Sequence, residues 1–183
     1  MSDDFLTFYA DPGEDFGWCL GHNNRLVARG ILKMWETAHE LADKIENDLG
    51  VFADTESPYL CDGVDPELMK RYIGRIVCED FRIYPWKVKA LKFNPVRTAR
   101  VIGALTFLAQ RHSIELVLQP ASIKSTAVAG GAEELFDTPL HENRHSNDAI
   151  MHFVYYQGTT ARGIDVAVPN DGVQGKDDGG VDD

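Results

Sequence analysis

The fold of this chain is decided by the stretch Leu6-Thr7-Phe8-Tyr9-Ala10-Asp11-Pro12-Gly13. Its aromatic and β-branched residues are typical of a buried strand, and the run is too short to nucleate a helix. The Pro-Gly pair predicts that the strand ends there. An acid at the tip of a rigid central strand loses little entropy when it holds a cation, so Asp11 is a candidate metal ligand. The alternative is that Asp11 only begins a turn, and taken alone the residue fits that interpretation better.

Two further extended runs follow this strand, at residues 16–20 and 26–32, with turn residues at 22–25 between them. Short runs with tight connections predict an antiparallel meander. Residues 34–49 place apolar side chains at steps of three and four, which predicts an amphipathic helix. Residues 51–63 show no period, and an N-cap followed by proline at 65–66 predicts a short helix through about Tyr72.

The second half of the chain alternates strands and helices. Residues 75–80 form a second apolar run that ends in Glu79 and Asp80, and residues 115–118 form another that stops at Pro120. Helices are expected from Asn94 to about residue 111 and over about 145–156. The apolar face expected for the first of these helices consists of Val96, Ala99, Ile102, Leu105, Thr106 and Ala109. This order predicts an α/β fold with a mixed five-stranded sheet, an antiparallel meander first and helices on both faces.

Length and composition indicate one ordinary globular domain. The chain has 183 residues, of which 44% are hydrophobic, and no apolar run of about 18 residues that would span a membrane. We expect a domain over residues 1–164 and an acidic, disordered tail over 165–183. The acidic N-terminus has no secretory character, which predicts a cytosolic protein. Cys19, Cys61 and Cys78 lie far apart without ligand-like pairing and are interpreted as reduced thiols.

The net charge of −11 is unevenly distributed. Six acids and one lysine give the tail −5, which leaves −6 for residues 1–164. Residues 81–114, by contrast, contain seven cations and no carboxylate. Rings interleaved with cations suit contacts with phosphates and unpaired bases, although a packing loop with solvated lysines is the alternative. The candidate DNA-binding residues here are Arg82, Tyr84, Trp86, Lys87, Lys89, Lys92 and Arg97.

Three polar residues share one face of the last predicted helix: His145, Asp148 three residues on, and His152 four further. The plain alternative is that this is the solvent face, which we favour for His152. For Asp148 the interpretation as a metal ligand is stronger than the solvent-face interpretation. Two acids at strand ends already need a third ligand, and oxygen-rich sites suit Mg²⁺ and Mn²⁺. Carboxylates from two strands and a helix can bracket a pair of cations, as in two-metal phosphodiester hydrolysis.

Together these residues resemble a known family. The chain is similar to RuvC-type Holliday-junction resolvases of the RNase H-like superfamily, and most of all to those encoded by bacteriophages. The resemblance covers roughly residues 5 to 157, and each piece is weak alone but specific in this order. The matching pieces are Asp11-Pro12-Gly13, Val77-Cys78-Glu79-Asp80, Ser122-Ile123-Lys124-Ser125-Thr126-Ala127-Val128-Ala129-Gly130 and His145-Ser146-Asn147-Asp148-Ala149.

The resemblance implies roles for individual residues. Asp11, Glu79 and Asp148 would be metal ligands for Mg²⁺ or Mn²⁺, with two ions per site. His145 occupies a position filled by acid or histidine in the family, so it would ligate metal or move a proton. Lys124 matches a family lysine near the scissile phosphate, whereas without the resemblance a solvated loop lysine is preferred. Asp80 should face away from the site, because neighbours on a strand point in opposite directions.

The resemblance also implies partners and one departure. Members of the family act as homodimers that cut two strands of branched DNA symmetrically, so the resemblance implies a homodimer here. The helix from Pro95 to Arg111 is the candidate interface. A second basic residue of the family pattern is replaced around Glu133-Glu134. Two rival functions stay open. One is another nuclease of the superfamily, such as a terminase nuclease or a flap or fork endonuclease, and the other is a non-catalytic DNA-binding protein. An actin-like ATPase is disfavoured by the short chain and the absence of a P-loop pattern.

Overall fold

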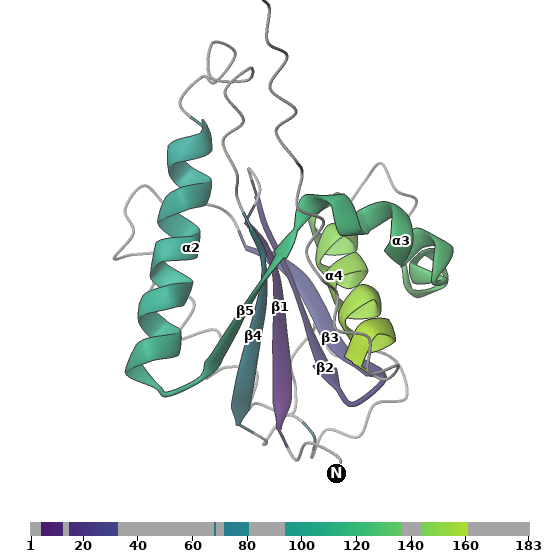
Figure 1. The fold of residues 1–183 in the computed structure, drawn as a ribbon, viewed down its shortest axis with the longest axis horizontal. Helices are drawn as coiled ribbons and strands as arrows, with labels where there is room; N and C mark the ends of the chain where they lie inside the picture. Colours follow the sequence, from purple (N-terminus) through teal and green to yellow (C-terminus); the bar gives the residue numbers. More distant parts are fainter. Residues whose placement is uncertain are drawn as a thin grey trace, which may run out of the picture.

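A mixed five-stranded sheet forms the centre of the computed structural model (Figure 1). The structure describes residues 5–12, 15–32, 68, 72–80, 94–136 and 144–160. The strand order is β3-β2-β1-β4-β5, in which β1 pairs antiparallel with β2 and parallel with β4. The strands are β1 (Leu6–Pro12), β2 (Phe16–His22), β3 (Arg25–Leu32), β4 (Ile73–Asp80) and β5 (Glu115–Pro120). The predicted α/β class, strand number and leading meander are confirmed.

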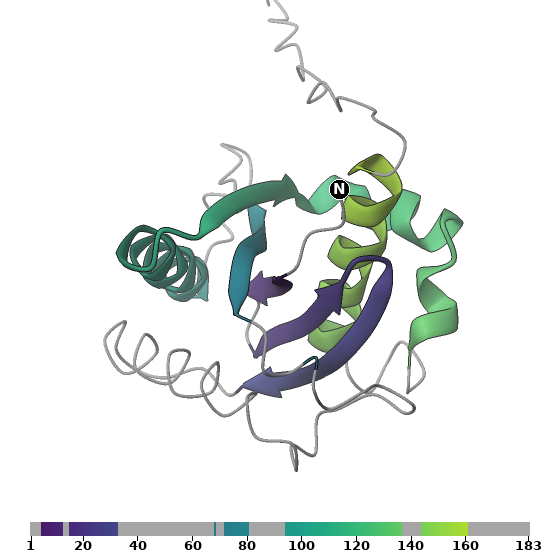
Figure 2. The same ribbon diagram turned by 90° about the horizontal axis from the view of Figure 1, so that it is seen from below.

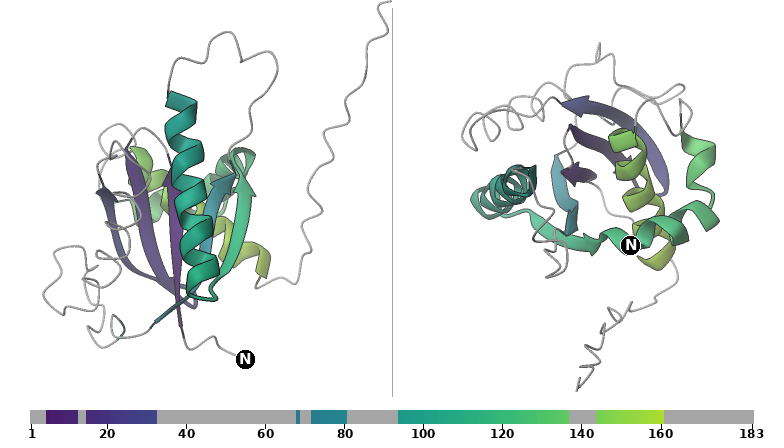
Figure 3. Two further views of the ribbon diagram at one scale, coloured as in Figure 1. Left: turned by 90° about the vertical axis from the view of Figure 1, so that its left-hand side faces the viewer. Right: turned by 90° about the horizontal axis from the view of Figure 1, so that it is seen from above.

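Two long helices cover opposite faces of this sheet, α2 (Asn94–Arg111) and α4 (Arg144–Thr160) (Figure 2, Figure 3). Side chains alternate along β1, so Phe8 and Ala10 pack on the side of α2, while Tyr9 packs on the side of α4. Every residue of β1 is buried, as expected for a strand with a neighbour on each side and a helix on each face. The first strand is thus the centre of the molecule.

The connection between β5 and α4 is made of short helices. It consists of η3 (Ala121–Ile123), α3 (Lys124–Ala129) and η4 (Ala132–Leu135). Together with α4 they enclose a small apolar cluster around Ile123 and Met151. The start of α3 therefore lies on the same side of the sheet as α4 (Figure 1).

The hairpin between β2 and β3 closes as predicted, with His22 opposite Arg25. Asn23 at its tip has a φ of 52°, in the left-handed region that asparagine tolerates better than most residues. Cys19 and Cys78 are buried free thiols, in agreement with the sequence. Among the described residues, no helix has the length and apolar character needed to span a membrane.

The apolar face expected for α2 is wrong in part. The residues buried against the sheet are Val101, Ala104, Leu105, Leu108 and Ala109, whereas Ala99 is exposed. Apolar residues surround this helix, and the large Phe107 is 55% exposed. The spacing of apolar residues is therefore compatible with more than one buried face of α2, and packing against β1 and β4 decides which face is buried.

Several predicted features lie outside the described residues. They are the helix at 34–49, the loop at 51–63, most of the helix expected up to Tyr72, Cys61, the basic residues 82–92 and the tail 165–183. The division into a domain over 1–164 and a tail stays a prediction.

Candidate active site

Three polar side chains form a row across the ends of three adjacent parallel strands. Ala10 of β1 pairs with Cys78 of β4, so Asp11 and Glu79 each come one residue later. Glu79 in turn pairs with Gln119 of β5. Because Val77 faces α4 and Cys78 faces α2, alternation directs Glu79 toward α4 and Asp80 away from it. Parallel pairing thus brings residues from distant parts of the sequence to one edge of the sheet.

The start of α4 approaches this row very closely. Asp11 is paired across the sheet with Gly17 of β2. A Cβ atom on Gly17 would lie 1.9 Å from the carbonyl oxygen of His145, which leaves no room for any side chain there. Glycine at this position therefore lets the first turn of α4 rest directly on β2. This contact places His145 and Asp148 next to Asp11.

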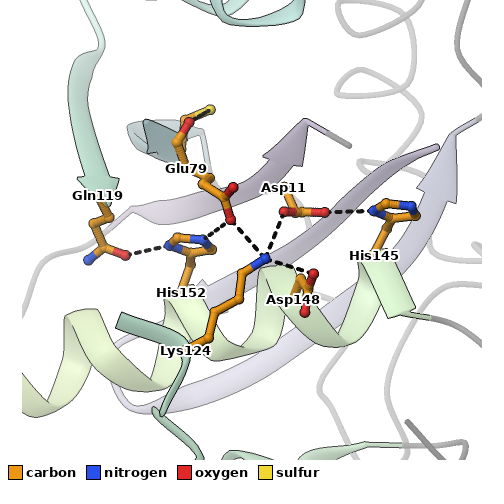
Figure 4. A network of polar contacts seen from close by, with 8 residues as sticks. Asp11, Glu79, Gln119, Lys124, His145, Asp148 and His152 are labelled. Carbon is orange, nitrogen blue, oxygen red and sulfur yellow. Dashed lines mark hydrogen bonds and ion pairs between the residues drawn. The ribbon is translucent and has the colours of Figure 1, made fainter. Parts of the chain in front are cut away.

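Lys124 lies at the centre of the three predicted acids (Figure 4). Its Nζ donates to Asp148 Oδ2 at 2.7 Å, to Glu79 Oε2 at 2.8 Å and, at 3.4 Å, to Asp11 Oδ1. The exposed fractions of the side chains are 4% for Asp11, 9% for Asp148, 20% for Glu79 and 28% for Lys124. The structure thus brings the three acids together, and Lys124 is not a solvated loop lysine.

The pKa values of this cluster show how strongly the groups depend on one another. Burial raises the pKa of Asp11, against the opposing effects of His145 and Lys124. Burial alone would also raise the pKa of Glu79, but contacts with His152 and Lys124 outweigh it and lower that pKa to about 2. For Lys124 burial would lower the pKa, yet the surrounding carboxylates raise it. The cluster therefore contains carboxylates that need a positive charge beside them.

His145 stands beside Asp11, with Nδ1 2.8 Å from Asp11 Oδ2. The hydrogen bond with Asp11 raises the pKa of His145, although partial burial opposes this. A raised pKa means that protonated His145 stabilises the folded state below its unfolded pKa. This contribution is lost as the pH rises through the folded pKa.

We therefore expect the metal-free protein to lose stability as the pH rises from about 6.5, the ordinary pKa of histidine, through the raised pKa of His145. Thermal denaturation in a chelator across this range should show a steeper fall for the wild type than for His145→Gln, which cannot be protonated. Parallel curves for the two proteins would contradict the assignment of this pair.

His152 is the clearest correction to the sequence-based interpretation. It was expected on the solvent face of α4, but it is fully buried. Its Nδ1 lies 2.8 Å from Gln119 Oε1, and its Nε2 lies 3.2 Å from Glu79 Oε2 (Figure 4). Gln119, which is 5% exposed, was not singled out from the sequence. The available signal was its position at the end of an apolar strand, the place where the two acids also lie.

The donor atoms form two groups that could each hold a cation. One consists of Asp11, Glu79 and His152, and the other of Asp11, His145 and Asp148. Within each group the ligand atoms lie within 4.8 Å of one another, close to the span of two metal–ligand bonds of about 2.1 Å each. Buried carboxylates and imidazoles are suitable ligands for a divalent ion. Each group therefore fits a divalent cation, and Asp11 belongs to both groups.

The predicted DNA-binding residues are described only in part. Arg82, Tyr84, Trp86, Lys87, Lys89 and Lys92 lie outside the described residues, and for Arg97 in α2 the structure describes only the backbone. Lys124 is also a predicted DNA-binding residue, because it matches the family lysine near the scissile phosphate, and it lies in the site. Glu133 and Glu134 are exposed on η4, so the acidic departure from the family pattern lies on the surface.

Comparisons with known proteins identify the fold. No family model and no curated protein matches the sequence. Among solved structures, Thermus thermophilus RuvC in complex with a Holliday-junction substrate is 15% identical, with a TM-score of 0.58 over 87% of this chain and 96% of that one. Another T. thermophilus RuvC structure is 16% identical, with a TM-score of 0.57 over 87% and 97%. The yeast mitochondrial Holliday-junction resolvase Ydc2 is 9% identical, with a TM-score of 0.50 over 88% and 82%. The chain therefore has the RNase H-like fold of the RuvC resolvases.

Proposed function

We propose that this protein is a metal-dependent endodeoxyribonuclease that resolves Holliday junctions or other branched DNA by paired nicking. The observation that carries the proposal is the convergence of Asp11, Glu79 and Asp148 from β1, β4 and α4 around one site. The fold is that of RuvC, and one of the similar structures is a RuvC bound to a Holliday junction. The prediction that this chain is of the bacteriophage type stays a prediction.

The site residues have distinct proposed roles. Asp11, Glu79, Asp148 and His145 would hold two Mg²⁺ or Mn²⁺ ions, which supply an activated water and charge stabilisation for phosphodiester hydrolysis. Lys124 is a fixed ammonium beside these ligands, where it can pair with the negative charge of a DNA phosphate. His145 is 27% exposed and can also exchange a proton with the substrate side of the site.

The proposed partners are branched DNA and a second copy of the chain. Two strands of a four-way junction must be cut, so two sites related by two-fold symmetry are needed. The helix α2 is the candidate interface, and two large apolar side chains are exposed near it, Phe107 on α2 and Leu118 on β5. The basic residues between 82 and 97 are the candidate contacts with DNA backbone and unpaired bases.

A cleavage assay on synthetic DNA tests the proposal. Four-way junctions, forks, flaps and linear duplexes of the same sequences would be incubated with Mg²⁺, Mn²⁺ or a chelator. We expect symmetric nicks in the junction with either metal and none in the chelator. Preferential cutting of flaps or forks would instead identify another nuclease of this fold. Tight binding of the junction without cutting under any condition would identify a non-catalytic DNA-binding protein.

A further inference from the structure

Gln119 fixes the orientation of the buried His152 ring. The amide oxygen of Gln119 lies 2.8 Å from Nδ1, and an amide oxygen can only accept a hydrogen bond. Nδ1 therefore carries hydrogen and donates it to Gln119. Both side chains are almost fully buried, so water does not compete for this bond. The pair comes from β5 and α4, which hold the ring rigidly against the row of strand-end acids.

The opposite nitrogen of the ring faces the acids. Nε2 lies 3.2 Å from Glu79 Oε2, and a ring nitrogen of His152 lies within 4.8 Å of a carboxylate oxygen of Asp11. With hydrogen on Nδ1, the neutral ring directs a lone pair from Nε2 toward a carboxylate, which is also an acceptor. Two acceptors 3.2 Å apart are stabilised by a positive charge, which Lys124, 2.8 Å from Glu79 Oε2, supplies from one side and which a proton or a metal ion can supply between them. Histidine ligands of metals commonly have this arrangement, with the other ring N–H bonded to an oxygen.

We infer that His152 Nε2 is a ligand of one divalent cation, together with Glu79 and Asp11, and that Gln119 orients it. The inference rests on the proposed metal-dependent function and adds the metal selectivity of the site. Mg²⁺ prefers oxygen ligands, whereas a nitrogen ligand raises the affinity of a site for transition-metal ions such as Mn²⁺. The site therefore binds Mn²⁺ in preference to Mg²⁺, and His152 supplies part of this preference.

His145 is the matched control, because it is the imidazole of the second group of ligands. Its Nδ1 faces Asp11 Oδ2 at 2.8 Å, and it is partly exposed, whereas His152 is buried. Glutamine at either position removes the imidazole and keeps a polar side chain of similar reach. The glutamine amide in His152→Gln can still donate a hydrogen bond to Glu79, so this variant separates a metal ligand from a residue that only positions Glu79.

The experiment uses the full chain without DNA and measures metal binding directly. Pulsed electron paramagnetic resonance of the Mn²⁺-loaded protein detects coupling to an imidazole nitrogen. We expect this coupling in the wild type and in His145→Gln, and its loss in the double variant with His152→Gln. Affinities measured by titration should fall about 10-fold for Mn²⁺ in His152→Gln, with less than about 2-fold change for Mg²⁺.

Two results would overturn the inference. One is the absence of nitrogen coupling in His145→Gln. The other is an equal change of Mg²⁺ and Mn²⁺ affinity in His152→Gln, including no change of either, which indicates that His152 only positions Glu79. If His152→Gln does not fold, Gln119→Glu and Gln119→Met test the same point. Glutamate keeps the acceptor for Nδ1 and should retain Mn²⁺ affinity, whereas methionine should lose it. The metal-binding measurements contain no DNA and do not depend on cleavage. If the protein shows nitrogen coupling but cuts no DNA in the cleavage assay, the proposed function is refuted and this inference stands.

Discussion

Replacing any one of the three acids with its amide is expected to reduce metal-dependent junction cleavage by about 10³-fold or more. Asp11→Asn, Glu79→Gln and Asp148→Asn preserve shape but remove a negative charge from the convergent cluster. Each amide is a poorer ligand for a divalent ion, so the site loses several kcal/mol of charge stabilisation. Single-turnover nicking of a labelled four-way junction measures this loss.

Binding and folding should survive these changes. Burial raises the pKa of Asp11, so a neutral amide there suits the metal-free protein well. Gel-shift assays in a chelator should give junction affinities within about 3-fold of the wild type, a difference below 1 kcal/mol. Asp80→Asn is the matched control, since Asp80 adjoins Glu79 but faces the other side of the sheet, and it should leave cleavage unchanged. Loss of junction binding in all three variants would assign the acids a structural role instead.

Removing the ammonium of Lys124 should affect both stability and catalysis. In Lys124→Met the three carboxylates lose their shared counterion, which costs about 2 kcal/mol after allowance for the partial exposure of the lysine. For a chain of this size that corresponds to a Tm about 4–8 °C lower in a chelator. Cleavage should fall about 10²-fold, as for the loss of one group that stabilises a transition state.

Divalent metal should restore most of that stability. Mn²⁺ neutralises the same carboxylates, so it should raise the Tm of Lys124→Met by more than it raises the Tm of the wild type. Lys124→Arg keeps the positive charge and serves as the control, with a chelator Tm near that of the wild type. An unchanged Tm for Lys124→Met, or an equal metal response in both proteins, would show that the lysine does not balance the acids.

The sequence predicted the sheet and the acids well because both depend on local patterns. Strands β1 and β4 are apolar runs that end in acid, and parallel pairing then places Asp11 and Glu79 side by side. The helical spacing of His145 and Asp148 placed them on one face. What the sequence could not give was which residues of α4 are buried. All residues from Ser146 to Phe153 are buried, so this part of the helix has no exposed face, and its polar residues could not be told from a solvent face by spacing alone.

The remaining errors have a common physical cause. The interpretations of His152, of Lys124 without the family resemblance, and of the face of α2 all depended on which element packs against which. The position of Gln119 at a strand end did not identify its partner, because His152 lies 33 residues away. Tertiary contacts of this kind override local preference. The family resemblance supplied the role of Lys124 but none for His152 or Gln119.

The contact between Gly17 and the carbonyl of His145 joins the start of the chain to its last described helix. A polypeptide still emerging from the ribosome carries Asp11 and Glu79 long before residues 144–160 are made. Bringing Gly17 and His145 together closes a long loop of chain. The entropy lost on closing it must be offset by contacts of α4 with the sheet, so this step comes late in folding. The row of strand-end acids therefore becomes the complete cluster with His145 and Asp148 only after residues 144–160 have been made and have packed on β2.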